Sequence, residues 1–206
     1  MEIGTQAGPA EAQLDKAAEP RFLLVLTHGA AGGIDAPDLL AARGAALRLG
    51  GTVARVLQPY RVRGARAPGS AQRQDQAWLR VIDALRGAVP AVPLVQGGRS
   101  NGARLACRTA AAASARAVLA LAFPLHPPGR PERSRIGELH AAGTDVLVIS
   151  GARDPFGVPG TADAARVIVL PGEAHSLARH PEAVGDAVGS WLRVILRLAD
   201  GSAAPG

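Results

Sequence analysis

The stretch of sequence that decides the fold runs from residue 94 to residue 105 and reads LVQGGRSNGARL. Its apolar start is typical of a buried strand, its glycines of a sharp turn, and the alanine-rich sequence after it of a helix. Ser100 stands between Gly98 and Gly102, so the pattern G-x-S-x-G lies between a strand and a helix. Such a serine has a strained backbone and presents its hydroxyl at the end of the sheet, and side chains at the two glycines would collide across the turn. We therefore predict that Ser100 is a nucleophile.

Short apolar runs alternate with helical patterns through the rest of the chain. The expected strands are Phe22–Thr27, Thr52–Leu57, Val92–Gln96, Ala117–Phe123, Asp145–Ser150 and Ala165–Leu170. The expected helices are Pro37–Leu49, Ala71–Arg86, Asn101–Ala113, Ile136–Ala142 and Pro181–Leu198. Runs that are apolar throughout indicate strands covered on both faces. The sequence predicts an α/β fold with a single, mostly parallel sheet of about six strands, helices on both faces and no lid domain.

Both ends of the chain differ in composition from its middle. Residues 1–19 and 200–206 are rich in small residues and show little periodicity, so we expect mobile N-terminal and C-terminal tails around one domain at 20–199. The first 19 residues also lack the apolar stretch of a signal peptide, and no run is long enough to span a bilayer. We expect a cytoplasmic protein without a membrane partner.

The charge of the chain gives little support to nucleic-acid binding. The formal net charge is +6, but the arginines are scattered and aromatic residues make up only 3% of the chain. No dense basic run with interleaved aromatic side chains is present, so we expect no nucleic-acid partner. A lone cysteine, Cys107, forms neither an internal disulfide nor a zinc site by itself, and we expect it to be a packing residue.

A serine nucleophile needs a base within hydrogen-bond reach and an acid that orients the base. Asp154 and His175 follow Ser100 in the chain order serine, acid, histidine, and each comes just after an expected strand. The carboxyl ends of parallel strands share one edge of the sheet, so the three loops can converge there. We predict Ser100, Asp154 and His175 as a catalytic triad.

Other acids and histidines fit this arrangement less well. Asp145 and Asp163 precede strands, at the wrong edge of the sheet, and Asp186 lies within the last helix. His180 is the alternative base, although its place before Pro181 is typical of a helix start. A turn aspartate and a solvent-exposed loop histidine are the structural alternatives for the predicted acid and base.

Acyl transfer also needs donors for the developing oxyanion. We predict the backbone N–H of Asn101, at a helix start, and that of Gly29 or Ala30 in the loop after the first strand. A flexible turn is the alternative interpretation of this loop. Weaker candidates for substrate binding are His28, His126 and three arginines of one loop, Arg61, Arg63 and Arg66. We expect His28 to contact the residues that line the site rather than the substrate. The arginines could hold an acidic group of the substrate, and the alternative is a solvated loop.

Five segments of the chain resemble small α/β-hydrolases, in particular dienelactone hydrolases and the testis-expressed hydrolase-like proteins. They read LTHGA at 26–30, GGRSNG at 97–102, FPLHPPGRP at 123–131, GARDPFG at 151–157 and GEAH at 172–175. The proline-rich segment is the most specific to this group. Ala103 and Ala174 depart from it, where a glycine and an acidic residue are common. The resemblance implies a hydrolase fold with Ser100, Asp154 and His175 as the triad.

These observations predict a serine hydrolase, similar to carboxylesterases and thioesterases, that cleaves a small soluble ester or thioester through an acyl-enzyme. The machinery needs no metal or organic cofactor. Lactonase and peptidase activity use the same groups and stay open, as does the oligomeric state. The alternatives are a hydrolase-fold module that binds or scaffolds a partner without catalysis, and a protein that binds an acidic ligand through its arginine loop.

Overall fold

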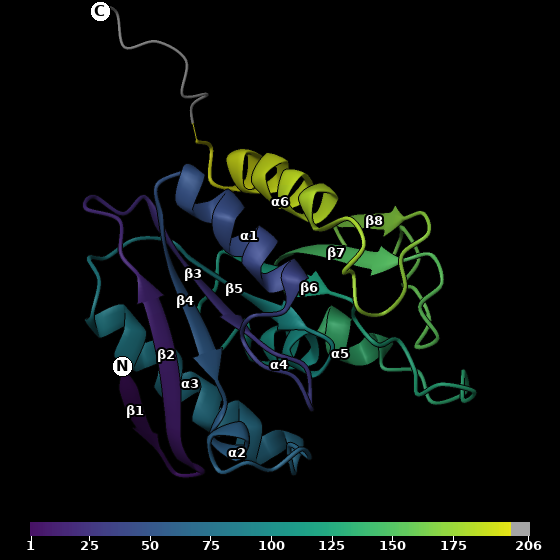
Figure 1. Ribbon diagram of the computed structural model, residues 1–206, viewed down its shortest axis with the longest axis horizontal. Helices are drawn as coiled ribbons and strands as arrows, with labels where there is room; N and C mark the ends of the chain where they lie inside the picture. The colour runs from purple at the N-terminus through teal and green to yellow at the C-terminus, as the bar shows by residue number, and fades with distance from the viewer. Residues whose placement is uncertain (199–206) are drawn as a thin grey trace, which may run out of the picture.

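The computed structural model of the chain describes residues 1–198, and its centre is one eight-stranded sheet in the order β1-β2-β4-β3-β5-β6-β7-β8 (Figure 1). All neighbours from β4 to β8 pair in parallel. These six strands are β3 (Phe22–Thr27), β4 (Gly51–Leu57), β5 (Leu94–Arg99), β6 (Ala117–Leu121), β7 (Asp145–Gly151) and β8 (Arg166–Leu170). Their carboxyl ends share one edge of the sheet, as the sequence predicts.

The structure of the N-terminal residues contradicts two predictions. The sequence predicts a mobile tail at residues 1–19 and a sheet of about six strands, but β1 (Glu2–Thr5) and β2 (Gly8–Asp15) form an antiparallel hairpin that extends the sheet beyond β4. The inward side chains of β2 are small alanines, which give a weak hydrophobic pattern. Polar side-chain contacts also join β2 to its neighbours. Arg55 of β4 donates to Gln13 at 2.7 Å, and Arg43 of α1 (Pro37–Arg48) forms an ion pair with Asp15.

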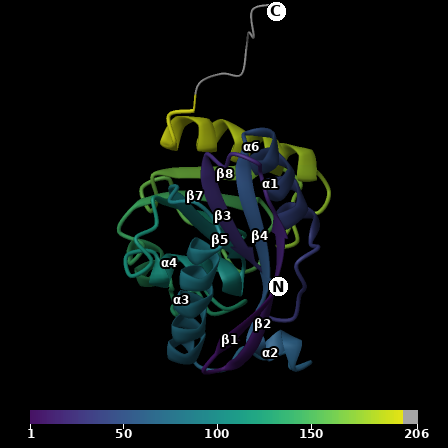
Figure 2. The same cartoon turned by 90° about the vertical axis from the view of Figure 1, so that its left-hand side faces the viewer.

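Helices cover both faces of the sheet (Figure 2). α1 (Pro37–Arg48) and α6 (Pro181–Ile195) pack together on one face. The other face carries α3 (Ala71–Gly87), α4 (Asn101–Thr109) and α5 (Ile136–His140), whereas the one-turn α2 (Pro59–Val62) lies at the end of β4. Ser70 caps α3 by accepting from the N–H of Arg73 at 3.4 Å.

The core has two layers because successive side chains of a strand point to opposite faces. Leu24 and Leu26 of β3 belong to the core layer that contains Trp191 of α6. Leu23 and Val25 belong to the opposite layer, which contains Trp78 of α3. All four β3 side chains are almost completely buried. A parallel strand covered on both faces thus appears in the sequence as a continuous apolar run.

The described residues 1–198 also bear on the remaining predictions about the architecture. No domain is inserted between strands over this range, and none of its helices is long and apolar enough to cross a membrane. The predicted C-terminal tail, 200–206, lies outside the described residues.

Candidate active site

Ser100 occupies a sharp turn between β5 and α4. Its backbone has φ +53° and ψ −115°, a conformation that costs energy for a residue with a side chain, and its N–H donates to the carbonyl of Leu121 at 2.9 Å. A Cβ on Gly98 would stand 2.5 Å from the carbonyl oxygen of Thr27, and one on Gly102 would stand 2.8 Å from that of His28. Both glycines are therefore needed for the close approach of the turn to the end of β3.

Backbone contacts bring the loops after β7 and β8 together. A Cβ on Gly151, the last residue of β7, would stand 2.5 Å from the carbonyl oxygen of Glu173. The same oxygen accepts from the N–H of Arg153 at 2.9 Å. Because the loops touch at this point, Asp154 on one and His175 on the other lie side by side.

Ser100, His175 and Asp154 form a continuous series of hydrogen bonds. The distance from His175 Nε2 to Ser100 Oγ is 2.9 Å, and that from His175 Nδ1 to Asp154 Oδ2 is 2.8 Å. The Asp154 side chain is fully buried, and its Oδ1 accepts from the N–H of Phe156 at 2.9 Å. A carboxylate at Nδ1 favours the tautomer with the proton on that nitrogen, which leaves Nε2 free to accept a proton from the serine.

The Phe156 ring packs on the ring of His175, with centroids 4.3 Å apart and an angle of 33° between the planes. This contact restricts rotation of the imidazole from one face. Phe156 was not among the predicted site residues. Its place two residues after Asp154 is the signal that could have indicated it.

The alternative acids and histidines lie elsewhere. His180 is the N-cap of α6, and its exposed ring pairs with Glu182 at 3.3 Å. His140 is also exposed, 3.8 Å from Asp163. Asp145 begins β7, at the other edge of the sheet from Ser100.

The predicted oxyanion donors border the serine. Asn101 is the first residue of α4, and the first N–H groups of a helix have no partner within it. Gly29 lies so close that a Cβ there would be 3.4 Å from Ser100 Cβ. The hydroxyl of Tyr60 donates to the carbonyl of Ala30 at 2.9 Å, and burial raises the pKa of Tyr60 to about 12, so this donor stays protonated.

His28 supports this loop from behind and does not line the site. Its ring is fully buried; Nδ1 lies 2.8 Å from the carbonyl of Gly29, and Nε2 accepts from the N–H of Gln58 at 3.0 Å. With both nitrogens bonded to the backbone, the ring has no free atom for a substrate. Burial lowers the pKa of His28, which keeps the ring neutral.

The remaining predicted substrate contacts do not converge on the serine. Arg61 donates to the carbonyls of Gly32 and Ala65, at 2.9 and 3.1 Å, and Arg63 donates to the carbonyl of Ala7. These two arginines therefore brace loops, and Arg66 is exposed.

His126 lies against the loop that carries Asp154. Its Nδ1 is 2.9 Å from the carbonyl of Pro127, its N–H donates to the carbonyl of Phe156 at 2.9 Å, and its ring packs on Gly157. The structure thus joins the proline-rich segment to the Asp154 loop, but gives the His126 ring no contact with Ser100.

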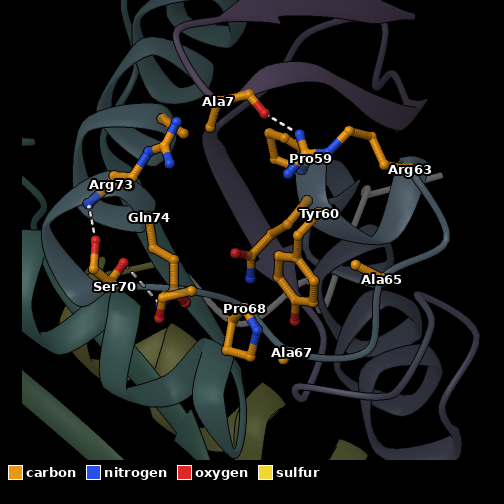
Figure 3. A pocket seen from close by; sticks show the side chains of 13 residues that line it. Ala7, Pro59, Tyr60, Arg63, Ala65, Ala67, Pro68, Ser70, Arg73 and Gln74 are labelled. Carbon is orange, nitrogen blue, oxygen red and sulfur yellow. Dashed lines mark hydrogen bonds between the residues drawn. The ribbon is translucent and has the colours of Figure 1, made fainter.

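A small, largely apolar cavity of about 140 Å³ lies between the loop after β4 and the first turns of α3 (Figure 3). Ala7 and Arg63 stand at one end, and Ala67 and Pro68 at the other. Ser100 is not part of its wall, but two wall residues are bonded to the segments beside Ser100. Gln74 accepts from the Asn101 amide at 2.8 Å, and Tyr60 holds Ala30 as described above. Neither Gln74 nor Tyr60 was predicted as a site residue, because nothing in a helical or loop pattern marks them.

Cys107 is fully buried in α4, as predicted for a packing residue. Burial raises the pKa of its thiol to about 12, so it is not a thiolate nucleophile at neutral pH. No cluster of metal-binding side chains is found among residues 1–198.

Comparison with known families shows that the chain belongs to the alpha/beta hydrolase domain family, whose model matches residues 20–180. Comparison with curated proteins finds no sequence match. The family assignment agrees with the sharp turn from strand to helix at Ser100.

Solved structures with the same fold cover nearly the whole chain. Est1E from Butyrivibrio proteoclasticus, solved with ferulic acid bound, superposes with a TM-score of 0.75 at 18% identity, over 96% of this chain and 99% of that one. XC6422 from Xanthomonas campestris, described as an α/β serine hydrolase without a lid, gives 0.74 at 20% identity, over 100% and 95%. A serine hydrolase homologue from Coxiella burnetii gives 0.77 at 15%, over 93% and 96%. At these identities the similarity shows the fold alone.

Proposed function

We propose that the protein is a serine hydrolase that cleaves small esters or thioesters with Ser100 as nucleophile, His175 as general base and Asp154 as the acid that orients it. The observation that carries the proposal is the series of two hydrogen bonds, 2.9 and 2.8 Å long, that runs from the hydroxyl through the imidazole to the carboxylate. A serine hydroxyl is a weak nucleophile alone and becomes reactive when a positioned base accepts its proton.

The reaction follows from this geometry. Ser100 Oγ attacks the carbonyl carbon while His175 Nε2 takes the hydroxyl proton, and the buried Asp154 carboxylate stabilises the resulting imidazolium. The N–H groups of Asn101 and of Gly29 or Ala30 receive the oxyanion. His175 then gives the proton to the leaving alcohol or thiol. The bond from the acyl carbon to that oxygen or sulfur breaks, the carbonyl re-forms, and the acyl group stays on Ser100. A water activated by the same imidazole hydrolyses this acyl-enzyme.

The cavity between α2 and α3 favours a small acyl group. Its wall residues Gln74 and Tyr60 are bonded to Asn101 and Ala30, the segments proposed to hold the carbonyl oxygen. We propose that the acyl group of the substrate enters it. A cavity of roughly 150 Å³ holds about one benzene ring, so the 140 Å³ here suits a short chain or a single ring.

We also propose membership of the subgroup that contains dienelactone hydrolases and the testis-expressed hydrolase-like proteins. The contact of the proline-rich segment with the Asp154 loop, through His126 and Phe156, supports this proposal because it gives the most specific of the shared segments a place beside the triad.

Turnover of p-nitrophenyl acetate, butyrate and octanoate tests the function. We expect the wild type to hydrolyse the short esters with a burst of p-nitrophenol, and Ser100→Ala to lower kcat by about 10⁴-fold or more. A folded wild type that turns over none of the esters, or a Ser100→Ala variant as active as the wild type, would overturn the proposal. The first result would favour a non-catalytic binding module.

A further inference from the structure

Arg99, the residue between Gly98 and the serine, is bonded to two distant segments. Its Nε donates to Asp38 Oδ2 at 3.0 Å, and its Nη2 donates to the backbone carbonyl of His175 at 2.7 Å. Asp38 lies in the first turn of α1, and His175 lies in the loop after β8. One guanidinium therefore connects the last residue of β5 to a helix on one face of the sheet and to the loop that carries the imidazole.

Asp38 anchors the guanidinium of Arg99 through a buried carboxylate. Its side chain is fully buried, and its second oxygen accepts from the N–H of Leu39 at 2.9 Å. Burial raises the pKa of Asp38, and the positive charge of Arg99 opposes that rise. A buried carboxylate in this place needs a cationic partner, and Arg99 supplies it.

The same guanidinium also borders the loop after β3. A Cβ on Gly29 would be 3.4 Å from Arg99 Nη1 and, at the same distance, from Ser100 Cβ. The Arg99 side chain thus touches or adjoins the oxyanion loop, the histidine loop and α1, all next to the serine.

We propose that Arg99 is a positioning residue that, anchored by Asp38, holds the backbone of His175 at the distance from Ser100 that proton transfer requires. The inference rests on the proposed function. The imidazole is fixed through its ring by Asp154 and Phe156, but the backbone from which it projects is fixed by the fork of Arg99. A displacement of about 1 Å in a reacting group can lower a rate by about 100-fold.

The informative variant is Arg99→Met with Asp38→Asn. The pair is removed together because a single change would leave a charge buried without its partner. The amide that replaces the Asp38 carboxylate keeps an oxygen for the N–H of Leu39. We expect kcat for p-nitrophenyl acetate to fall by about 10-fold to 100-fold with KM changed by less than about threefold, since the variant loosens the base without altering the proposed acyl cavity.

Arg99→Lys is the second variant, and it keeps the charge next to Asp38. A lysine ammonium is a point charge without the planar fork, so it does not reach the carboxylate and the His175 carbonyl in the same geometry. We expect a loss of about threefold to tenfold in kcat, and this variant keeps the proposal testable if the double variant does not fold.

A matched control is Arg108→Met with Asp75→Asn. Arg108 pairs with Asp75 at 2.6 Å, and its side chain is 13% exposed against 16% for Arg99. The hydrogen bonds of Arg108 join α4 to α3 and α5 rather than to the histidine loop. We expect the control to lower the unfolding temperature while kcat stays within about twofold of the wild type.

¹H NMR gives a readout that does not depend on activity. The proton on His175 Nδ1, in the hydrogen bond to Asp154, is expected to give a downfield resonance in the wild type. We expect it to broaden or vanish in both Arg99 variants and to remain in the control. A folded Arg99 variant that keeps both this resonance and the wild-type kcat would overturn the proposal. If the wild type hydrolyses no ester, the proposed function fails, and the resonance still decides whether Arg99 positions His175.

Discussion

Two groups of residues around Ser100 differ in how tightly they are fixed. The first comprises Asp154, His175, Arg99 and Asp38, joined by charged hydrogen bonds of 2.7–3.0 Å between four separate segments of the chain. The second lines the cavity of about 140 Å³ between α2 and α3, with small apolar side chains and a few polar ones. The groups proposed to react are thus held by several hydrogen bonds between segments. We expect the small apolar residues of the cavity wall, unlike Gln74 and Tyr60, to tolerate a change of size without loss of the chemistry.

The largest expected effect is on the first group. Asp154→Asn should lower kcat by about 10⁴-fold, because an amide in place of the carboxylate favours the wrong imidazole tautomer and does not stabilise the imidazolium. Steady-state turnover of p-nitrophenyl acetate measures this effect. Asp145→Asn, at the start of the strand that precedes the Asp154 loop, is the control and should leave kcat unchanged. Equal losses in the two variants would contradict the role of Asp154.

The turn that carries the serine should tolerate no added volume. A Cβ at Gly102 would stand 2.8 Å from the backbone oxygens of both His28 and Thr27, which cannot move without breaking the end of β3. We expect Gly102→Val to lower the free energy of unfolding in urea by about 3 kcal/mol, or to prevent folding.

Gly87, the last residue of α3, is the matched control because a Cβ there would meet nothing within 4 Å. Gly87→Ala should leave the free energy of unfolding equal to that of the wild type or raise it by up to about 1 kcal/mol. A Gly102→Val protein as stable as the wild type would refute the close packing of the turn.

The cavity should respond to volume with a change of selectivity. Ala67 lines it and is exposed, so Ala67→Leu narrows the cavity without disturbing the core. We expect kcat/KM for the butyrate ester to fall by about 10-fold relative to the acetate ester, the discrimination that one or two methylenes give. Ala112→Leu, at an exposed turn after α4, should leave the ratio unchanged. An unchanged ratio in Ala67→Leu would show that the acyl group binds elsewhere.

The smallest expected effect is a dependence of stability on pH. Burial lowers the pKa of His28 from 6.5, so the unfolded chain takes up a proton at a higher pH than the folded protein does. The contribution of neutral His28 to stability is therefore complete above about pH 6.5 and is lost as the pH falls below that value. Urea unfolding at about pH 7.5 and about pH 5.5 should show a smaller loss on acidification in His28→Gln than in the wild type, and an equal loss would contradict this assignment.

The sequence predicted the architecture where the physical pattern was strong. The parallel strands β3, β6 and β7 appear as continuous apolar runs because their side chains are buried on both faces, and the glycines around Ser100 indicate the turn. The hairpin at residues 2–15 was missed because its inward residues are mostly alanine and its stability comes from pairing with β4, which no local pattern reveals. The partners Arg99, Asp38 and Tyr60 were missed for the same reason, since contacts between distant segments leave no mark in composition or periodicity.

Labelling with a fluorophosphonate, followed by mass analysis of the peptides, tests whether the Ser100 hydroxyl is activated. An activated serine hydroxyl is phosphonylated and an ordinary one is not. We predict a single adduct on Ser100 in the wild type, strongly slowed labelling in His175→Ala, and none in Ser100→Ala. A folded wild type that stays unlabelled, or that carries its adduct on another residue, would contradict the proposed role of Ser100 as the nucleophile.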